Sequence, residues 1–480
     1  MPLLVLFVYL FNVSLPFPVY NMLAVLLVAL GIVFAFGGLK LIVGTLFFVI
    51  PLSMELPIGL GDSKILFPSE AIALVLLVAF FVRVFFLQKF KSRFLKHPVT
   101  VIIIFYVAVL FATTFTSTMF VVSAKFAFIN VMYISVFYFL ANLYLRNKAN
   151  QRLSPAFLYG ISLFFVICFA LYKHAGYDFT KGYVNLSMRP FYSDHAIYSA
   201  CIAMLLPIFA AFAIKGKLLG LGKLAQTAAW FISIALVVGI VFSYSRAAWV
   251  SLAAAFAIFV LLLLKLKPVY FVLLFLVGAA FFLSQRDSLI SGWKLNRSNS
   301  SVSNPTIEEQ TKSITNISND VSNAERLNRW SCAYRMFLDR PFTGFGPGTY
   351  QFQYLKYQIP SEMTRISVTT AYNNPLGKGG SAHSEYLLAL SESGIMGFLG
   401  ILGIVLSSIF YGMVAYYRAS GGKDKIIILA SLLGIITYGV HVFFNNYLNI
   451  DKTASLFWIL ISILVTIDSS RKDKPLTYGA

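Results

Sequence analysis

Long apolar runs, separated by short polar connections, dominate the pattern of hydrophobic and polar positions along the chain. A helix needs about 20 mostly apolar residues to cross a hydrocarbon core roughly 30 Å thick. Three spans are expected at the start of the chain, at residues 3–18, 20–36 and 38–53, and eleven clear runs follow: residues 71–88, 99–119, 125–145, 155–172, 196–214, 226–244, 247–264, 269–285, 386–417, 426–445 and 454–468. The pattern predicts an all-α polytopic membrane protein, a bundle of about 12–14 transmembrane helices.

One long polar passage, from Arg286 to His383, interrupts the apolar pattern. Its Ser298 to Asn323 stretch is rich in Ser and Asn and poor in apolar residues, which is typical of a mobile segment. The passage predicts four parts: an N-terminal transmembrane domain of about 11 spans (1–285), a long loop with short helices (286–385), three C-terminal transmembrane helices (386–468) and a tail (469–480).

Basic residues accumulate on one side of the predicted spans. Of the 38 Lys and Arg residues, twenty fall in loops on that side, six in the short loops opposite and eleven in the long loop, while Arg246 lies at an outer boundary. Because Lys and Arg are enriched in cytoplasmic loops, both termini are predicted to be cytoplasmic and the long loop to lie outside. The net charge of +20 then describes mainly a surface facing anionic lipid, with no need for nucleic acid.

The composition is 59% hydrophobic and 12% charged, with a mean hydropathy of +0.80, which excludes a soluble protein. No Asp, Glu or Lys is expected near the middle of a span, although ion-coupled transporters normally need such groups. Transport therefore stays a secondary hypothesis, and chemistry is expected at the outer face. The three cysteines have no metal-ligand or disulfide spacing, so neither a metal nor a cofactor is predicted.

The first candidate at the outer face is Arg246, in a tight turn between two spans that also contains Ser245. A guanidinium group stays charged and makes forked hydrogen bonds to phosphate oxygens. A fixed arginine at the membrane surface therefore suits a lipid-linked phosphate. The alternative is an interfacial anchor for the turn.

The second candidate is a helix in the long loop. Ser322 and Glu325 have the spacing of a capping box, and apolar residues follow at helical spacing until Pro341. This pattern predicts an amphipathic helix against the membrane or the span ends. Arg326 and Arg329 lie near one face of it as candidate phosphate ligands, although ordinary solvation of a surface helix explains them equally well.

The third candidate is His383, which follows a Gly-rich segment and directly precedes an apolar span. The segment lacks the spacing of a nucleotide-binding phosphate loop, so a nucleotide site is rejected. A histidine at a helix N-terminus is kept neutral by the helix dipole, as a general base must be. Glu385 and several arginines nearby favour a catalytic role over a structural one, which is the commoner fate of a lone histidine.

The fourth candidate is Arg189, in an outer loop that leads into the span starting at residue 196. It is a second possible phosphate ligand from the membrane domain. Asp194 and His195, at the end of the same loop, are expected to cap or support the start of that helix.

In their order and topology, several short motifs resemble the O-antigen ligase and O-antigen polymerase superfamily. The resemblance covers about residues 185–400. The residues that carry it are Ser245-Arg246, Glu325-Arg326 with Trp330, Pro341 to Gly348, His383 to Leu387, and Glu392 to Gly397. Ser384 departs from the pattern, because family members commonly carry Asn at that position.

This resemblance implies a metal-independent membrane glycosyltransferase of the GT-C type in a bacterial inner membrane, with a periplasmic active site. Such an enzyme moves a glycan from an undecaprenyl-diphosphate carrier to an acceptor hydroxyl. Arg189, Arg246 and Arg326 would hold the diphosphate and His383 would deprotonate or orient the acceptor, with Ser245, Arg329 and Glu385 supporting them. A single displacement would invert the anomeric centre.

Three acceptors remain open. The leading hypothesis is ligation to lipid A core or a similar lipid. Polymerisation of repeat units and transfer to Ser or Thr of a protein use the same donor. A lipid-linked glycan transporter is the alternative from a different class.

Overall fold

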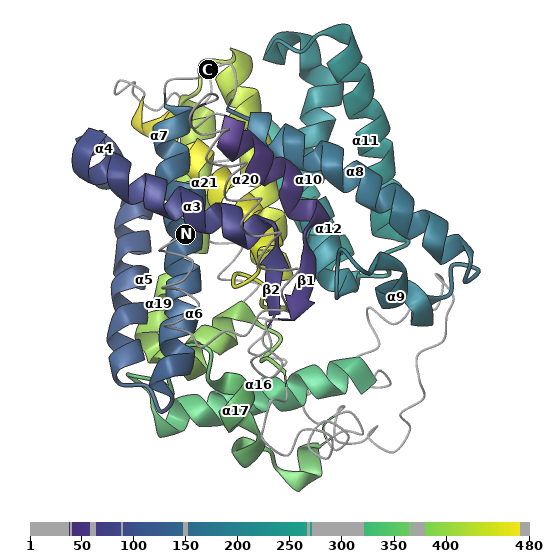
Figure 1. Ribbon diagram of the computed structural model, residues 1–480. Coiled ribbons are helices and arrows are strands. Elements are labelled where there is room, and N and C mark those ends of the chain that lie inside the picture. Colours follow the sequence, from purple (N-terminus) through teal and green to yellow (C-terminus); the bar gives the residue numbers. More distant parts are fainter. Residues whose placement is uncertain are drawn as a thin grey trace, which may run out of the picture.

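The computed structural model (Figure 1) describes residues 41–57, 64–87, 90–146, 152–265, 321–363 and 380–470, together with Gly38, Val269, Tyr270 and Ser367. The expected spans 3–18 and 20–36, and the expected span 269–285 apart from Val269 and Tyr270, therefore lie outside the described residues. So do most of the Ser/Asn-rich tract and of the Gly-rich segment before His383.

Helices make up nearly all of the described part, which confirms the all-α polytopic fold. Nine helices in that part are long and apolar enough to cross a membrane: Pro98–Phe115 (α5), Phe120–Leu145 (α6, η3 and α7), Ser154–Ala175 (α8), His195–Leu219 (α10), Lys223–Val241 (α11), Arg246–Leu263 (α12), Glu385–Arg418 (α19), Gly422–His441 (α20) and Asp451–Ser469 (α21). Two more apolar helices, Leu41–Leu52 and Ser69–Val82 (α3), match the expected spans 38–53 and 71–88.

The core of the bundle is centred on α21, which Figure 1 shows in yellow among the other helices. Its residues from Asp451 to Ile467 are all buried, including Trp458. A helix that is apolar on all sides is buried on all sides, because no face is left for solvent. It packs against α10, α19, α20 and the π-helical segment Ser135–Leu140 (η3), and so ties the C-terminal helices to the N-terminal ones.

A short β-hairpin is a departure from the predicted all-helical pattern. Met54–Pro57 (β1) pairs antiparallel with Lys64–Phe67 (β2), with Met54 opposite Phe67. It follows the helix Leu41–Leu52, whose last turn, Ile50–Leu52 (η1), contains Pro51. The two strands are too short to produce the alternating pattern by which a strand is recognised in a sequence.

Lys452 was expected in a short outer loop, but it lies in the first turn of α21 with 2% of its surface exposed. Its ammonium group donates to the carbonyl oxygens of Ile50 (3.0 Å), Pro51 (3.2 Å) and Ser53 (2.8 Å). Carbonyls at a helix C-terminus lack intrahelical partners and carry partial negative charge. The lysine is therefore buried because it satisfies the end of another helix.

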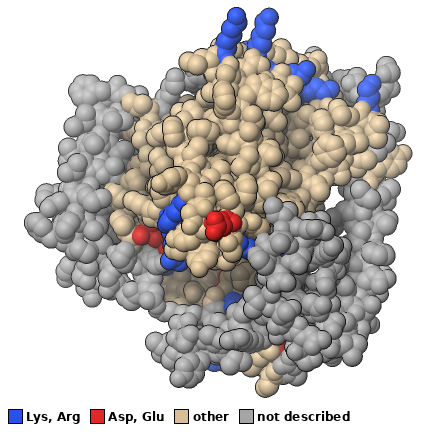
Figure 2. Space-filling view, turned by 90° about the vertical axis from the view of Figure 1, so that its right-hand side faces the viewer, with Lys and Arg blue, Asp and Glu red and all other residues tan. Residues whose placement is uncertain are grey.

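The loops gather at two ends of the bundle, as the distribution of basic residues predicts. At one end, Arg152 pairs with Asp424 (Nη1–Oδ1, 2.7 Å) and His97 contacts Asp468 (Nε2–Oδ2, 3.3 Å). Lys and Arg side chains stand out at the end where α21 terminates (Figure 2). At the other end lie the connections 116–119, 176–194, 242–245 and 442–450 and the described part of the long loop, joined by hydrogen bonds such as Thr118 N to Phe345 O (3.0 Å).

Candidate active site

The helix Val321–Asp339 (α16) lies across the loop end of the bundle, over the start of α19 (Figure 1). It ends before Pro341, as predicted, because proline cannot continue a helix. Its buried residues are Glu325, Asn328, Arg329, Cys332, Ala333 and Met336. Tyr334 and Leu338, from the predicted apolar stripe, are 50% and 59% exposed. The buried face of the helix is therefore partly polar and charged, and two large apolar residues of the predicted stripe point outward.

Arg329 fastens α16 to the segment that leads to His383. Its Nε donates to Glu325 Oε1 (2.8 Å) and its Nη1 donates to Ser381 O (2.9 Å). The guanidinium group also lies over the ring of Tyr354, 5.3 Å from the centroid. Because Arg329 is 5% exposed and hydrogen-bonded to both Glu325 and Ser381, it is placed to position the segment.

A glycine-rich turn in the loop packs against a break in α19. Gly394 has φ +64° and ψ −163°, so the expected single span 386–417 is two helical pieces that meet at an angle. A Cβ at Gly394 would lie 2.5 Å from Phe342 O, so a larger residue does not fit there. Ile395 N donates to Pro341 O (2.8 Å), which attaches the loop to the broken turn.

Glu392, just before this break, orders the turn. Its carboxylate accepts the backbone N–H groups of Gly348 (Oε2, 2.8 Å) and Tyr350 (Oε1, 2.9 Å). Its carbonyl oxygen accepts Gly346 N (2.8 Å). Tyr350 in turn donates its hydroxyl to Arg329 O (2.8 Å), so the contacts of Glu392 continue into α16. The start of α19 and the loop therefore form one packed unit.

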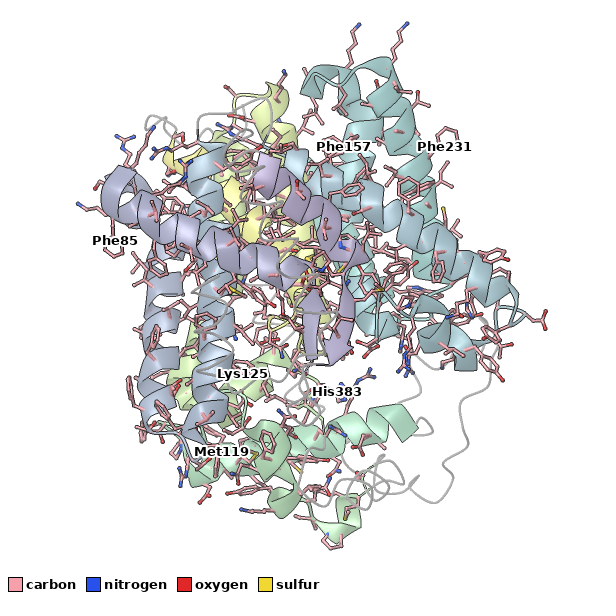
Figure 3. The ribbon with its side chains drawn as sticks, viewed as in Figure 1. Phe85, Met119, Lys125, Phe157, Phe231 and His383 are labelled. Carbon is pink, nitrogen blue, oxygen red and sulfur yellow. The ribbon has the colours of Figure 1, made fainter. Side chains whose placement is uncertain are left out.

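His383 immediately precedes Ser384, the N-cap of α19, whose hydroxyl accepts Leu387 N at 3.5 Å. The His383 backbone is left-handed (φ +51°), an uncommon conformation for a non-glycine residue. Its carbonyl accepts the indole N–H of Trp330 from α16 (3.4 Å). Figure 3 shows His383 above α16, between that helix and the membrane domain.

The surroundings of His383 keep its ring neutral at pH 7. Burial lowers the pKa from 6.5 to about 4, assisted by the positive charges of Arg329 and Arg326, while Asp194 acts in the opposite direction. Placing a cation beside two guanidinium groups in a low-dielectric site is unfavourable. Burial and two arginines therefore favour the neutral ring, and the contribution expected from the helix dipole stays a prediction.

A polar network connects the start of α10 with the connection before α21. Asp194 caps α10 through Ala196 N (2.8 Å), as expected, and its other oxygen accepts the hydroxyl of Tyr447 (3.1 Å). That hydroxyl also lies 3.3 Å from Asn445 Oδ1, and Asn445 Nδ2 lies 3.3 Å from the Nε2 atom of the buried His441. The pattern Asn445-Asn446-Tyr447 after an apolar span is the signal by which the sequence could have pointed to it.

Glu385 faces this network. Its backbone N–H donates to Val442 O (3.0 Å) and Asn445 O (3.1 Å), and its carboxylate accepts Leu448 N (3.4 Å). Ser381, on the other side of His383, donates to Asn446 Oδ1 (2.5 Å). The residues flanking His383 are therefore held by the connection between α20 and α21.

The two arginines of the membrane domain lie at the same end of the bundle. Arg189 is exposed at the C-terminus of Val184–Met188 (α9), with its carbonyl accepting the ammonium of Lys173 (3.2 Å). Arg246 is the first residue of α12 and half-buried, after the buried N-cap residue Ser245. The structure thus brings Arg326 and Arg329 to His383.

These features define a multi-pass helical membrane protein with a polar site at one end of its bundle. Among the described residues, no three His, Cys, Asp or Glu side chains gather in a way that could hold a metal ion.

Residues 231–402 match the family model described as O-antigen ligase, which supports the relation to the O-antigen ligase superfamily that the motifs indicated. The match runs from within α11 into α19, and includes Arg246, Arg326 and His383, while Arg189 precedes it. It indicates a membrane enzyme of the glycosyltransferase kind, with glycan or glycolipid substrates. No curated protein matches the sequence.

Proposed function

We propose that the protein transfers a glycan from an undecaprenyl-diphosphate carrier to an acceptor hydroxyl at the periplasmic face of the bacterial inner membrane. The observation that carries this proposal is the position of His383, which is neutral and flanked by Arg326 and Arg329 at the end of a membrane bundle. Among the possible acceptors, lipid A core or a similar glycolipid is favoured by the match to the O-antigen ligase family.

In this proposal His383 accepts the proton of the acceptor hydroxyl, and the freed oxygen lone pair attacks the anomeric carbon of the donor sugar. The bond between that carbon and the diphosphate oxygen breaks, and undecaprenyl diphosphate leaves with the electron pair. One displacement inverts the anomeric centre. A base within hydrogen-bond reach of the hydroxyl contributes roughly 10²–10⁴-fold to the rate of such a step.

The leaving diphosphate gains negative charge as the bond breaks, and fixed arginines can stabilise that charge without reorganising. Arg326, whose charge acts on the ring of the proposed base, would bind the diphosphate from α16, while Arg246 and Arg189 would bind it from the membrane domain. Ser245, in the same turn as Arg246, supports that site, and Arg329 and Glu385 support the segment that carries His383. The active site would lie on the periplasmic side and both termini in the cytoplasm.

The test uses the purified full-length protein in lipid nanodiscs with a lipid-linked glycan and EDTA. Three acceptors are offered in parallel: lipid A core, a second lipid-linked glycan, and a peptide rich in Ser and Thr. We expect product with lipid A core; product with only one of the others assigns the enzyme to polymerisation or to protein glycosylation. Absence of transfer to all three, with the donor bound, would refute the proposal.

The diphosphate ligands are tested separately by donor binding. Arg246→Ala is expected to bind the lipid diphosphate at least tenfold more weakly, because a charge-assisted hydrogen bond contributes about 1.5–3 kcal/mol. Lys223→Ala, at the opposite end of α11, is the matched control for loss of a cation. Equal affinity in Arg246→Ala and wild type would remove this residue from the site.

A further inference from the structure

The carboxylate of Asp194 has more hydrogen-bond partners than the N-cap of a helix requires. Its Oδ1 accepts Ala196 N (2.8 Å) and lies 3.2 Å from His195 Nδ1, and its Oδ2 accepts the Tyr447 hydroxyl (3.1 Å). Burial acts to raise the pKa of Asp194, but these partners, led by His195, hold the pKa well below its usual range. The carboxylate is therefore charged at neutral pH and fixed in orientation.

The same carboxylate is linked to the turn that carries His383. Tyr447 is 8% exposed and Asn445 is 2% exposed, so the contact between them (OH to Oδ1, 3.3 Å) is inside the protein. The carbonyl of Asn445 accepts Glu385 N at 3.1 Å, two residues after His383. Asp194 is thus linked to the His383 turn through two buried residues, the side chain of Tyr447 and then Asn445, whose backbone carbonyl makes the last contact. These contacts connect the start of α10 with the start of α19.

Three charged residues act on the His383 ring: Arg329 and Arg326 from α16, and Asp194 from the start of α10. His195 and Tyr447 face Asp194, and His441 packs against the same network. When the ring takes a proton, it becomes a cation beside two other cations. Asp194 is the acidic member of this set, and it is the one whose charge favours the protonated ring.

We infer that Asp194 is a positioning residue for the transfer step. Through Tyr447 and Asn445 it holds the connection between α20 and α21 against the His383 turn, and its charge stabilises the imidazolium that forms when His383 takes the acceptor proton. This inference rests on the proposed function for its catalytic part, while the coupling between Asp194 and His383 exists with or without turnover.

The decisive variant is Asp194→Asn. Asparagine is a good N-cap residue whose single carbonyl oxygen can still accept from Ala196 N, while its amide group can donate to the Tyr447 hydroxyl. The helix start is therefore preserved while the charge is removed. We expect kcat at pH 7 to fall about 10- to 100-fold and donor binding to stay unchanged. The acid limb of kcat/KM moves to lower pH, because His383 loses the charge that favours its protonated form.

Two further variants separate the effect of the Asp194 charge from the effect of its contact with Tyr447. Tyr447→Phe cuts the link to the connection but keeps the carboxylate, so we expect a smaller loss of kcat and an acid limb within a few tenths of a pH unit of wild type. Asp178→Asn removes an exposed carboxylate from the same outer loop, at a left-handed position that asparagine tolerates, and serves as the matched control.

A measurement without turnover completes the test. The rate at which diethyl pyrocarbonate modifies His383, followed by mass spectrometry of the peptide, rises with the neutral fraction of the ring. In Asp194→Asn the midpoint of that rise is expected at lower pH than in wild type. An unmoved midpoint overturns the inference, as does wild-type kcat in Asp194→Asn. If the midpoint shifts but the protein transfers no glycan, the proposed function is refuted, while the coupling between Asp194 and His383 is supported.

Discussion

Helices α10 and α19 begin at the same end of the bundle, and each has a histidine next to its capping residue. In α10 the cap is Asp194 and His195 follows it; in α19 the cap is Ser384 and His383 precedes it. His195 is 37% exposed and its ring contacts Asn185, ten residues earlier in the chain. The partners of His383 come from α16, which lies more than fifty residues away. The two histidines therefore have similar places in the sequence, but residues that are distant in the sequence give them different surroundings.

The difference also concerns rigidity. The start of α10 is fixed by its own loop, in which Asn185 accepts His195 N (2.8 Å), and by the Tyr447 hydroxyl, which donates to Asp194 (3.1 Å). The start of α19 is fixed from two directions, by the connection 442–450 and by the glycine-rich turn that Glu392 orders. A histidine in such a site keeps its place while its proton is exchanged. The comparison supports the proposed role of His383 as the base and the proposed role of α10 in supplying the charge that assists it.

The strongest test of the comparison replaces each histidine in turn. His383→Ala is expected to lower kcat by about 10²–10⁴-fold with donor affinity retained, because the acceptor loses its base. His195→Gln should cost less than tenfold, since it removes only a partner of Asp194. Both are measured as initial rates of glycan transfer at saturating donor. If the two variants lose equal activity, the distinction between the two helix starts is wrong.

A second test separates the neighbouring arginines of α16. Arg326→Ala is expected to weaken donor binding about 10- to 100-fold, as for the loss of one charge-assisted hydrogen bond. The same variant raises the pKa of His383 from about 4, so the acid limb of kcat/KM moves to higher pH, opposite to the shift in Asp194→Asn.

The matched variant Arg329→Ala breaks a buried ion pair with Glu325 (2.8 Å). Removing one partner of such a pair costs about 3–5 kcal/mol of stability. We therefore expect Arg329→Ala to lower the melting temperature clearly, while the affinity for the donor changes little. A stable Arg329→Ala with weakened donor binding would reverse the roles assigned to the two residues.

The third test loosens the start of α19 without touching His383. Glu392→Gln leaves one of the N–H groups of Gly348 and Tyr350 without an acceptor, which costs about 1–3 kcal/mol for a buried group. We expect a lower Tm and a moderate loss of kcat as α16 shifts over His383. Glu362→Gln, which alters a partly exposed pair with Arg335, should cost under about 1 kcal/mol. Equal melting temperatures for the two variants would contradict the role of Glu392.

The sequence predicted the helices well, because an apolar run needs only its own composition to be recognised as a span. Within the described residues the expected spans coincide with helices to within a few residues, and the sole large difference is the break at Gly394. Arg246, Arg326 and His383 stood out because charged and imidazole groups are rare in this chain. Their placement at one end of the bundle followed from the order of the spans.

The role of Glu392 could not be predicted in the same way. Its partners are backbone N–H groups more than forty residues away, and a backbone group leaves no mark on the sequence. Lys452 was misplaced for a similar reason, since its partners are carbonyl oxygens at the end of another helix. The pairing of Arg329 with Glu325 was within reach, as the two residues are four apart on one helix, but whether that pair is buried depends on tertiary packing.

The smallest expected effect is on stability. The pKa of His383 is about 4 in the folded protein and 6.5 without its surroundings, so between these values the unfolded chain binds more protons. The stabilisation from the neutral ring is complete above about pH 6.5 and is lost as the pH falls towards 4.

His383→Gln removes this pH dependence, and the difference in Tm between wild type and variant should change by roughly 1–3 °C between pH 6.5 and pH 4. His195→Gln is the control, because it removes a histidine whose half-exposed ring lies outside the His383 turn. Melting curves in nanodiscs from pH 4 to 7 measure both, and a slope that persists in His383→Gln would assign the pH dependence to another group.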